Sequence, residues 1–118
     1  MSLTSYLVNR MFTSADKKRD QGLQTPGDVA RKDDLSYGPH GKWNLLDVYT
    51  PKNAAGRLPV IVNIHGGGWV YGTKEVYQFY GMSLAQRGFA VVNFNYRLAP
   101  ASHFPAPLED LNRVILWI

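Results

Sequence analysis

Apolar runs separated by polar turns predict a series of short strands along this chain. Residues 58–64 form an apolar, β-branched run, which is typical of a strand buried on both faces. Residues 89–96 repeat this pattern and predict a second buried strand. Two shorter runs, 35–37 and 43–49, flank a turn at residues 38–41, and we expect them to pair as antiparallel strands.

Apolar residues also recur at helical spacing after each buried strand. Residues 73–87 predict a helix that has Thr73 as its N-cap and ends before Gly88. Residues 107–118 predict another helix, with Pro107 in its first turn. Two paired strands followed by strand, helix, strand and helix indicate the start of an α/β fold with a mainly parallel sheet and flanking helices.

The first 34 residues differ from the rest of the chain. Residues 3–18 predict a separate helix. Its apolar side carries Leu3, Leu7 and Met11. We interpret residues 1–34 as an N-terminal helical, cap-like segment and residues 35–118 as part of one α/β domain. The last predicted helix has no stop signal before Ile118, so we expect the chain to be truncated before the fold is complete.

Composition narrows the class of protein. A chain of 118 residues with 45% hydrophobic and 19% charged residues can form one globular domain. The absence of cysteine excludes a disulfide framework and fits a reducing compartment. The three histidines are widely separated and lack ligand spacing, so we expect no metal site.

Charge and hydropathy restrict the possible partners. The net charge is +4, but the one basic cluster, residues 17–19, lies between Asp16 and Asp20, a pattern typical of a solvated face. We therefore expect no nucleic acid as a partner. Arg10 interrupts the apolar residues near the N-terminus, so we expect no signal peptide and no membrane span, and a cytoplasmic location.

Three consecutive glycines, Gly66, Gly67 and Gly68, follow the predicted strand and carry the main chemical signal of the chain. Without Cβ atoms, these residues can turn successive backbone N–H groups toward one point, where they bind an anion or a developing oxyanion. A flexible turn between a strand and a helix would use the same residues. The glycines alone leave both interpretations open.

Two nucleotide-binding motifs fail at this place in the sequence. Gly67 and Gly72 have the spacing of a phosphate-binding loop, but Thr73 and Lys74 follow in the reverse of the required order. A dinucleotide-binding fingerprint needs a third glycine where the chain has Tyr71. We therefore expect no nucleotide and no other cofactor.

Four segments together resemble the hormone-sensitive-lipase-like branch of the α/β-hydrolase esterases. They are residues 46–51 (LDVYTP), 65–72 (HGGGWVYG), 95–100 (NYRLAP) and 104–111 (FPAPLEDL). The resemblance covers about residues 35–118 and implies an eight-stranded α/β-hydrolase sheet in the order 1-2-4-3-5-6-7-8, of which this chain supplies strands one to four. It also implies that the nucleophilic serine of a Gly-x-Ser-x-Gly turn, the acidic residue and the catalytic histidine lie beyond Ile118.

The resemblance implies roles for the glycine motif. Gly67 and Gly68 would donate their backbone N–H groups to an oxyanion. His65 and Gly66 would shape the loop, and His65 would not act as the catalytic base.

Other residues of the motifs are expected to bind substrate or to hold loops. Trp69 and Tyr71 are candidates for the wall of a substrate pocket, although simple packing would also explain aromatic residues there. Arg97 is expected to form a salt bridge that holds its loop rather than to bind a substrate carboxylate. Glu109 and Asp110 are adjacent on a predicted helix, point in different directions and are expected to be acids of its first turn.

The activity implied by the resemblance is that of a serine carboxylesterase or lipase-like hydrolase acting on a small-molecule ester. An amidase or formamidase of the same fold and a non-catalytic ligand-binding protein are the alternatives. No serine of the chain lies in a nucleophile turn, so we expect residues 1–118 alone to be inactive. The implied strand order leaves one edge of residues 58–64 unpaired, and we expect the remainder of the hydrolase domain or a second copy to pair with it.

Overall fold

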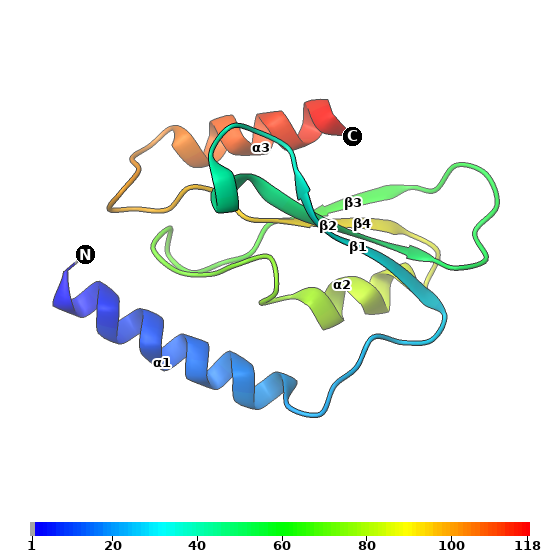
Figure 1. The fold of residues 1–118 in the computed structure, drawn as a ribbon, viewed down its shortest axis with the longest axis horizontal. Helices are drawn as coiled ribbons and strands as arrows, with labels where there is room; N and C mark the ends of the chain where they lie inside the picture. The colour runs from blue at the N-terminus through cyan, green and yellow to red at the C-terminus, as the bar shows by residue number, and fades with distance from the viewer. Residues whose placement is uncertain (1) are drawn as a thin grey trace.

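A computed structural model describes residues 2–118 (Figure 1). The elements follow one another in the order α1 (Leu3–Asp20), β1 (Val29–Ser36), the 3-10 helix η1 (Gly41–Asn44), β2 (Leu45–Pro51), β3 (Val60–Asn63), α2 (Gln78–Ala85), β4 (Ala90–Phe94) and α3 (Ala106–Trp117). In Figure 1, α3 covers one face of the sheet, and α2 and α1 lie on the other side. The α/β fold predicted from the sequence is confirmed.

The four strands form one sheet in the order β1-β2-β4-β3, which confirms the order implied by the family resemblance. β1 pairs with β2 and β2 pairs with β4 in antiparallel orientation, whereas β3 and β4 are parallel. The sheet is therefore mixed, and its parallel part is confined to β3 and β4. Within residues 2–118, one edge of β3 has no partner strand.

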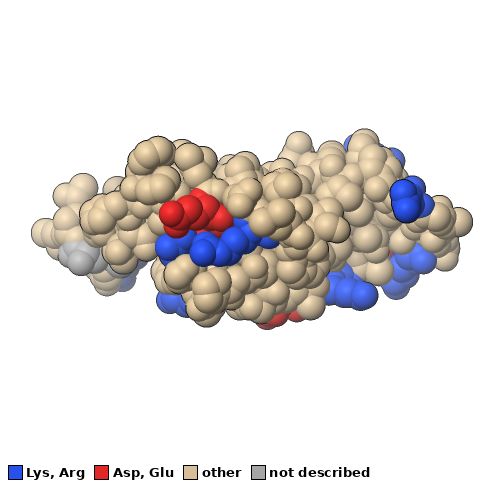
Figure 2. Space-filling view, turned by 90° about the horizontal axis from the view of Figure 1, so that it is seen from above, with Lys and Arg blue, Asp and Glu red and all other residues tan. Residues whose placement is uncertain are grey.

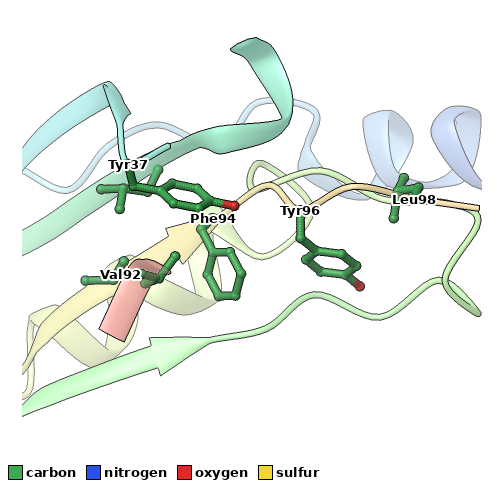
Figure 3. Close-up of a cluster of buried hydrophobic side chains, with 7 residues drawn as sticks. Tyr37, Val92, Phe94, Tyr96 and Leu98 are labelled. Atoms are coloured by element: carbon green, nitrogen blue, oxygen red, sulfur yellow. The ribbon is translucent and has the colours of Figure 1, made fainter. Parts of the chain in front are cut away.

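The side of the sheet that faces α3 carries the larger apolar cluster, because side chains alternate between the faces of a strand. Leu46 of β2 and Phe94 of β4 are buried together with Val114 of α3. The cluster continues past the end of β4 through Tyr96 and Leu98 (Figure 3). This packing holds the segment that follows β4 against the sheet.

The opposite face of the sheet packs against α2. Tyr49 and Val91 form a second buried cluster with Met82 of that helix. Gly81 lets the helix approach closely, since a Cβ there would lie 3.1 Å from the Tyr49 ring and 3.2 Å from Asn93 Nδ2. Because β3 and β4 are parallel and adjacent, the segments that follow them leave the sheet at the same end of the strands.

The structure corrects the bounds of the predicted strands. β1 begins at Val29, whereas the sequence predicted a start at residue 35. The prediction missed this half of the strand because residues 31–34 are all charged and show no apolar pattern. Such charges suit β1, which lies at the edge of the sheet. Residues 41–44 form a 3-10 helix, so β2 starts at Leu45 rather than at residue 43. β3 and β4 are also shorter than predicted.

One helix start is also corrected. Helix α2 begins at Gln78, and Thr73 does not cap it. The backbone N–H of Lys74 instead donates to Asn95 Oδ1 at 2.7 Å, which draws this part of the chain toward the sheet and away from a helical turn. The helix predicted at residues 107–118 is confirmed by α3, with bounds that differ by one residue.

Helix α1 confirms the predicted N-terminal helix and extends it to Asp20. The side that was expected to be apolar remains exposed, including Leu3, Leu7 and Met11. A different side of α1 contacts the segment between β3 and α2, where the Phe12 ring centroid lies 5.4 Å from that of Tyr71. Asn9 Nδ2 also donates to the Val70 carbonyl oxygen at 3.4 Å.

Candidate active site

The segment between β3 and α2, residues 64–77, contains the glycine motif, and we call it the glycine loop. Gly67 forms its tightest turn, because its carbonyl oxygen accepts hydrogen bonds from Val70 N–H at 3.2 Å and Tyr71 N–H at 3.1 Å. Gly67 has a φ of +135°, and a Cβ there would lie 2.0 Å from the Tyr71 carbonyl oxygen. Only glycine fits this position without movement of the loop.

The backbone N–H groups of the three glycines are free to bind a ligand. Within residues 2–118, no hydrogen bond uses the N–H of Gly66, Gly67 or Gly68 as its donor. Gly66 and Gly68 are exposed, and Gly67 is half-buried. Free N–H groups on a turn of fixed shape favour the anion-binding interpretation over a flexible connection.

His65 is buried beneath the glycine loop, with only 4% of its surface exposed. Its Nδ1–H donates to the Gly66 carbonyl oxygen at 2.8 Å, and the Tyr96 hydroxyl donates to the His65 carbonyl oxygen at 2.6 Å. The Tyr96 ring stacks on the imidazole, with ring centroids 4.3 Å apart. Nε2 has no hydrogen-bond partner in the part of the chain that the structure describes. These contacts place His65 as a support for Gly66.

The stability of the fold is expected to fall as the pH drops below about 6.5, the usual histidine pKa in an unfolded chain. Burial lowers the pKa of His65, so between the two pKa values the folded protein binds fewer protons than the unfolded chain. The stability contributed by neutral His65 is therefore complete above the unfolded pKa and is lost as the pH falls toward the lowered one.

Urea unfolding from about pH 8 to about pH 5 measures this loss. His65→Asn is expected to reduce the pH dependence of the free energy of unfolding. His103→Gln is the control, because His103 is exposed, and it is expected to leave that pH dependence unchanged. The same pH dependence in His65→Asn as in the unsubstituted protein would contradict the prediction.

Trp69 and Tyr71 line different cavities on two sides of the glycine loop. Trp69 is 56% exposed and, together with Phe104 and Leu108, lines an apolar cavity of about 460 Å³. Tyr71 lines a cavity of about 540 Å³ between the loop and α1. The hydroxyl of Tyr71 donates to the carboxylate of Asp16 in α1. The three glycines line the cavity on the Tyr71 side.

Arg97 forms the salt bridge that the sequence predicts. Its Nη2 lies 2.9 Å from Asp110 Oδ1, and its backbone N–H donates to the same carboxylate at 2.9 Å. Glu109 lies in the first turn of α3, as predicted, and its carboxylate is 2.9 Å from Arg97 Nη2. The expectation that Asp110 is also an acid of the first turn is wrong, because Asp110 lies beyond that turn and is fully buried. Its spacing of four residues from the apolar Val114 was the available signal, since both then share a helix face.

Figure 2 looks onto the α3 side of the molecule and shows a surface with few charges. Acidic and basic side chains lie side by side there in one small cluster. The exposed large apolar residues of α3 are Leu108, Ile115, Leu116 and Trp117.

Lys74 is buried and surrounded by carboxylates. Its Nζ lies 2.8 Å from Asp34 Oδ1, 2.9 Å from Asp47 Oδ1 and 2.5 Å from Glu75 Oε1. A phosphate at this position would meet three negative charges, so the geometry supports the rejection of a phosphate-binding loop. Lys74 and Asp47 were not predicted from the sequence to form a buried pair. A lone acid inside the apolar pattern of a strand was the available signal.

No group of three or more His, Asp or Glu side chains within residues 2–118 is arranged to hold a metal ion. Among the helices of the same residues, none combines the length and apolar character needed to cross a bilayer.

Comparisons with known proteins agree with this geometry. Residues 46–118 match the BD-FAE family. Esterase LipQ of Mycobacterium tuberculosis is 36% identical over 93 residues, which cover 76% of this chain and 22% of LipQ. Versiconal hemiacetal acetate esterase of Aspergillus parasiticus is 36% identical over 97 residues, which cover 81% of this chain and 30% of that enzyme. The chain thus spans less than a third of the length of these relatives.

A solved structure extends the likeness to the three-dimensional arrangement. Esterase B from Lactobacillus rhamnosis is 28% identical and matches with a TM-score of 0.89 over 97% of this chain and 37% of its own. The matched family covers more than half of the chain, from β2 to α3. The chain therefore belongs to the BD-FAE family and has the α/β-hydrolase fold of the esterases that it is similar to.

Proposed function

We propose that the glycine loop is the oxyanion hole of a serine carboxylesterase and that sequence outside residues 1–118 supplies the nucleophile. The free N–H groups of Gly67 and Gly68, on a turn that requires glycine, are the observation that carries the proposal. The similar proteins that are named esterases support the class of reaction.

The proposed reaction uses the backbone of this chain to stabilise charge. A serine oxygen attacks the ester carbonyl carbon, its proton passes to a base, and the carbonyl oxygen becomes an oxyanion. The N–H groups of Gly67 and Gly68 donate to that oxygen. Because the turn is already fixed, the donors do not reorganise, and each lowers the barrier by about 3 kcal/mol. As the intermediate collapses to an acyl-serine, the base gives the proton to the leaving alcohol. Water then hydrolyses the acyl-serine, which releases the acid and restores the serine.

The two cavities beside the glycine loop would hold the two parts of the ester. The Trp69 cavity is lined almost entirely by apolar groups and suits an alkyl or aryl group. Trp69 has a φ of +67°, an uncommon conformation for a bulky residue that is often retained at functional sites. Esterase B, which this chain resembles in structure, was also solved with a tributyrin phosphonate inhibitor. An ester with a short alkyl chain fits these observations.

The N-terminal segment, residues 1–34, would act as a cap over the Tyr71 cavity. Helix α1 supplies Phe12 and Asp16 to that cavity, opposite the glycines. The last residues of the segment, 29–34, already belong to β1, so α1 is the part that covers the site.

Protein produced from the complete gene is expected to hydrolyse p-nitrophenyl esters at a rate that depends on acyl length. Each methylene buried in the Trp69 cavity contributes about 0.8 kcal/mol, or roughly fourfold in kcat/KM. The acetate, butyrate and hexanoate esters measure this slope, and Trp69→Ala is expected to flatten it. Leu116→Ala is the control, because Leu116 is 78% exposed on α3 and does not line the cavity.

The other functions give different results in the same assays. Binding of an ester without turnover would favour a non-catalytic ligand-binding protein, and faster turnover of anilides than of esters would favour an amidase. Residues 1–118 alone are expected to show no turnover, because an oxyanion hole without its nucleophile leaves only a small residual effect.

We further propose that the free edge of β3 pairs with the remainder of the hydrolase domain or with a second copy of the chain. Val60 is 45% exposed, and no charge or proline protects Val60–Asn63. Light scattering of the purified 118-residue polypeptide is expected to show dimers or larger species, and Val60→Lys is expected to reduce them. A monomer that unfolds cooperatively would contradict this proposal.

A further inference from the structure

The buried Lys74 near the end of the glycine loop is a feature that the proposed function does not use. Its ammonium group joins three parts of the chain, since Asp34 belongs to β1, Asp47 to β2 and Glu75 to the loop itself. Only 4% of Lys74 and none of Asp47 is exposed. Lysine is almost never buried to this extent without a partner, and here two of the three partners, Asp34 and Asp47, lie in the sheet.

Lys74 also contacts a row of polar side chains that crosses three strands. Asp47 of β2 is in register with Asn93 of β4, and Asn93 is in register with Asn63 of β3. Asn93 Nδ2 donates to the Lys74 carbonyl oxygen at 3.3 Å, and Asn63 Nδ2 donates to Asn93 Oδ1 at 3.2 Å. Lys74 N–H donates to Asn95, as described above. Both backbone groups and the ammonium group of Lys74 are therefore bound to the sheet or its extension.

Strand β1 is distorted where it reaches the lysine. Its register shifts between Lys32 and Leu35, and Asp34 within that shift has a φ of +57°. Aspartate adopts this left-handed conformation as a single residue only occasionally. Burial by itself lowers the pKa of Lys74, but hydrogen bonds to the carboxylates outweigh burial and raise the pKa above its usual value. The ammonium group thus stays charged and holds the distorted strand.

The part of the glycine loop just before Lys74 packs against His65 at Gly72. Gly72 lies two residues before Lys74 in the sequence. A Cβ at Gly72 would lie 2.3 Å from His65 Nδ1 and 2.7 Å from the Gly66 carbonyl oxygen. With no space at this contact, a shift of the chain at Lys74 would displace His65 and, through their hydrogen bond, Gly66.

We propose that Lys74 is a positioning residue, which holds the N–H donors of the glycine loop in place through its buried ion pair with Asp47 of β2. The inference rests on the proposed oxyanion function of that loop. Lys74 touches no reacting atom and acts through Gly72 and His65.

Lys74→Met tests the role of the charge, because methionine keeps most of the side-chain length. In the full-length esterase, kcat is expected to fall at least about tenfold while KM changes less than about threefold, because displaced donors weaken binding of the transition state. The variant also leaves Asp47 buried without its partner, which is expected to lower the Tm.

The double variant Lys74→Met/Asp47→Asn separates positioning from stability. Asparagine removes the unpaired charge, so the Tm is expected to recover, while kcat is expected to stay low. Recovery of kcat together with the Tm would overturn the proposal. Lys52→Met is the matched control, because it makes the same change at an exposed lysine in the connection between β2 and β3. Its kcat is expected to stay within about twofold of the unsubstituted value.

Amide hydrogen exchange of residues 66–72 provides a readout that does not require activity. Faster exchange is expected in Lys74→Met and in the double variant, and unchanged exchange is expected in Lys52→Met. A full-length protein without ester turnover would contradict the proposed function. Unchanged exchange in the double variant would instead contradict the positioning role of Lys74.

Discussion

Gly67→Ala is expected to lower kcat of the proposed esterase by about 10²-fold or more. The added Cβ would lie 2.0 Å from the Tyr71 carbonyl oxygen, and the φ of +135° at Gly67 suits glycine alone. The turn must therefore move, which displaces the N–H groups of Gly67 and Gly68 from the oxyanion. KM is expected to change less, because the hydrogen bonds to the oxyanion form fully only in the transition state. Steady-state kinetics of Gly67→Ala with p-nitrophenyl butyrate measure both effects.

Two further glycine variants separate loop geometry from backbone strain. Gly56→Ala is the control, because Gly56 has a φ of +75° and open space around it, in the connection between β2 and β3. It is expected to cost about 1 kcal/mol of stability without loss of kcat. In Gly68→Ala, the added Cβ also has open space around it, at a φ of +59°. We therefore expect a smaller loss of kcat than for Gly67→Ala. If Gly67→Ala keeps kcat within about threefold, the glycines form only a turn.

The order of the elements could be predicted because most of them bury an apolar pattern of recognisable period. The runs at residues 58–64 and 89–96 became β3 and β4, and the helical spacing of residues 107–118 became α3. The charged N-terminal half of β1 could not be found in this way. An edge strand is held by hydrogen bonds along one side and need not be apolar.

The polar part of the candidate site could not be predicted from these patterns. Lys74 and Asp47 are 27 residues apart in sequence and meet only because β2 and the glycine loop lie side by side in the fold. The position of Lys74 against the sheet also explains why α2 does not start after Thr73, where the local sequence predicts a helix. Tertiary hydrogen bonds to the backbone of Lys74 outweigh the local preference.

Asp110→Ala is expected to lower the free energy of unfolding by about 3–5 kcal/mol, because it leaves the guanidinium of Arg97 without its buried partner. Burial by itself raises the pKa of Asp110, but hydrogen bonds from Arg97 outweigh burial and hold that pKa below its usual range. The stability that this carboxylate contributes is therefore present above the unfolded pKa of about 3.9 and is lost as the pH falls through the lower folded value.

Urea unfolding of Asp110→Ala and Glu109→Ala tests this prediction with a matched pair. Glu109 is the neighbouring acid and also contacts Arg97, but its side chain is 53% exposed, so its loss is expected to cost no more than about 1 kcal/mol. The free energies of unfolding of Asp110→Ala and the unsubstituted protein are expected to become more similar in acid, because Asp110 of the unsubstituted protein becomes protonated there. Equal losses for the two variants would mean that apolar packing against α3, rather than the ion pair, holds the segment after β4.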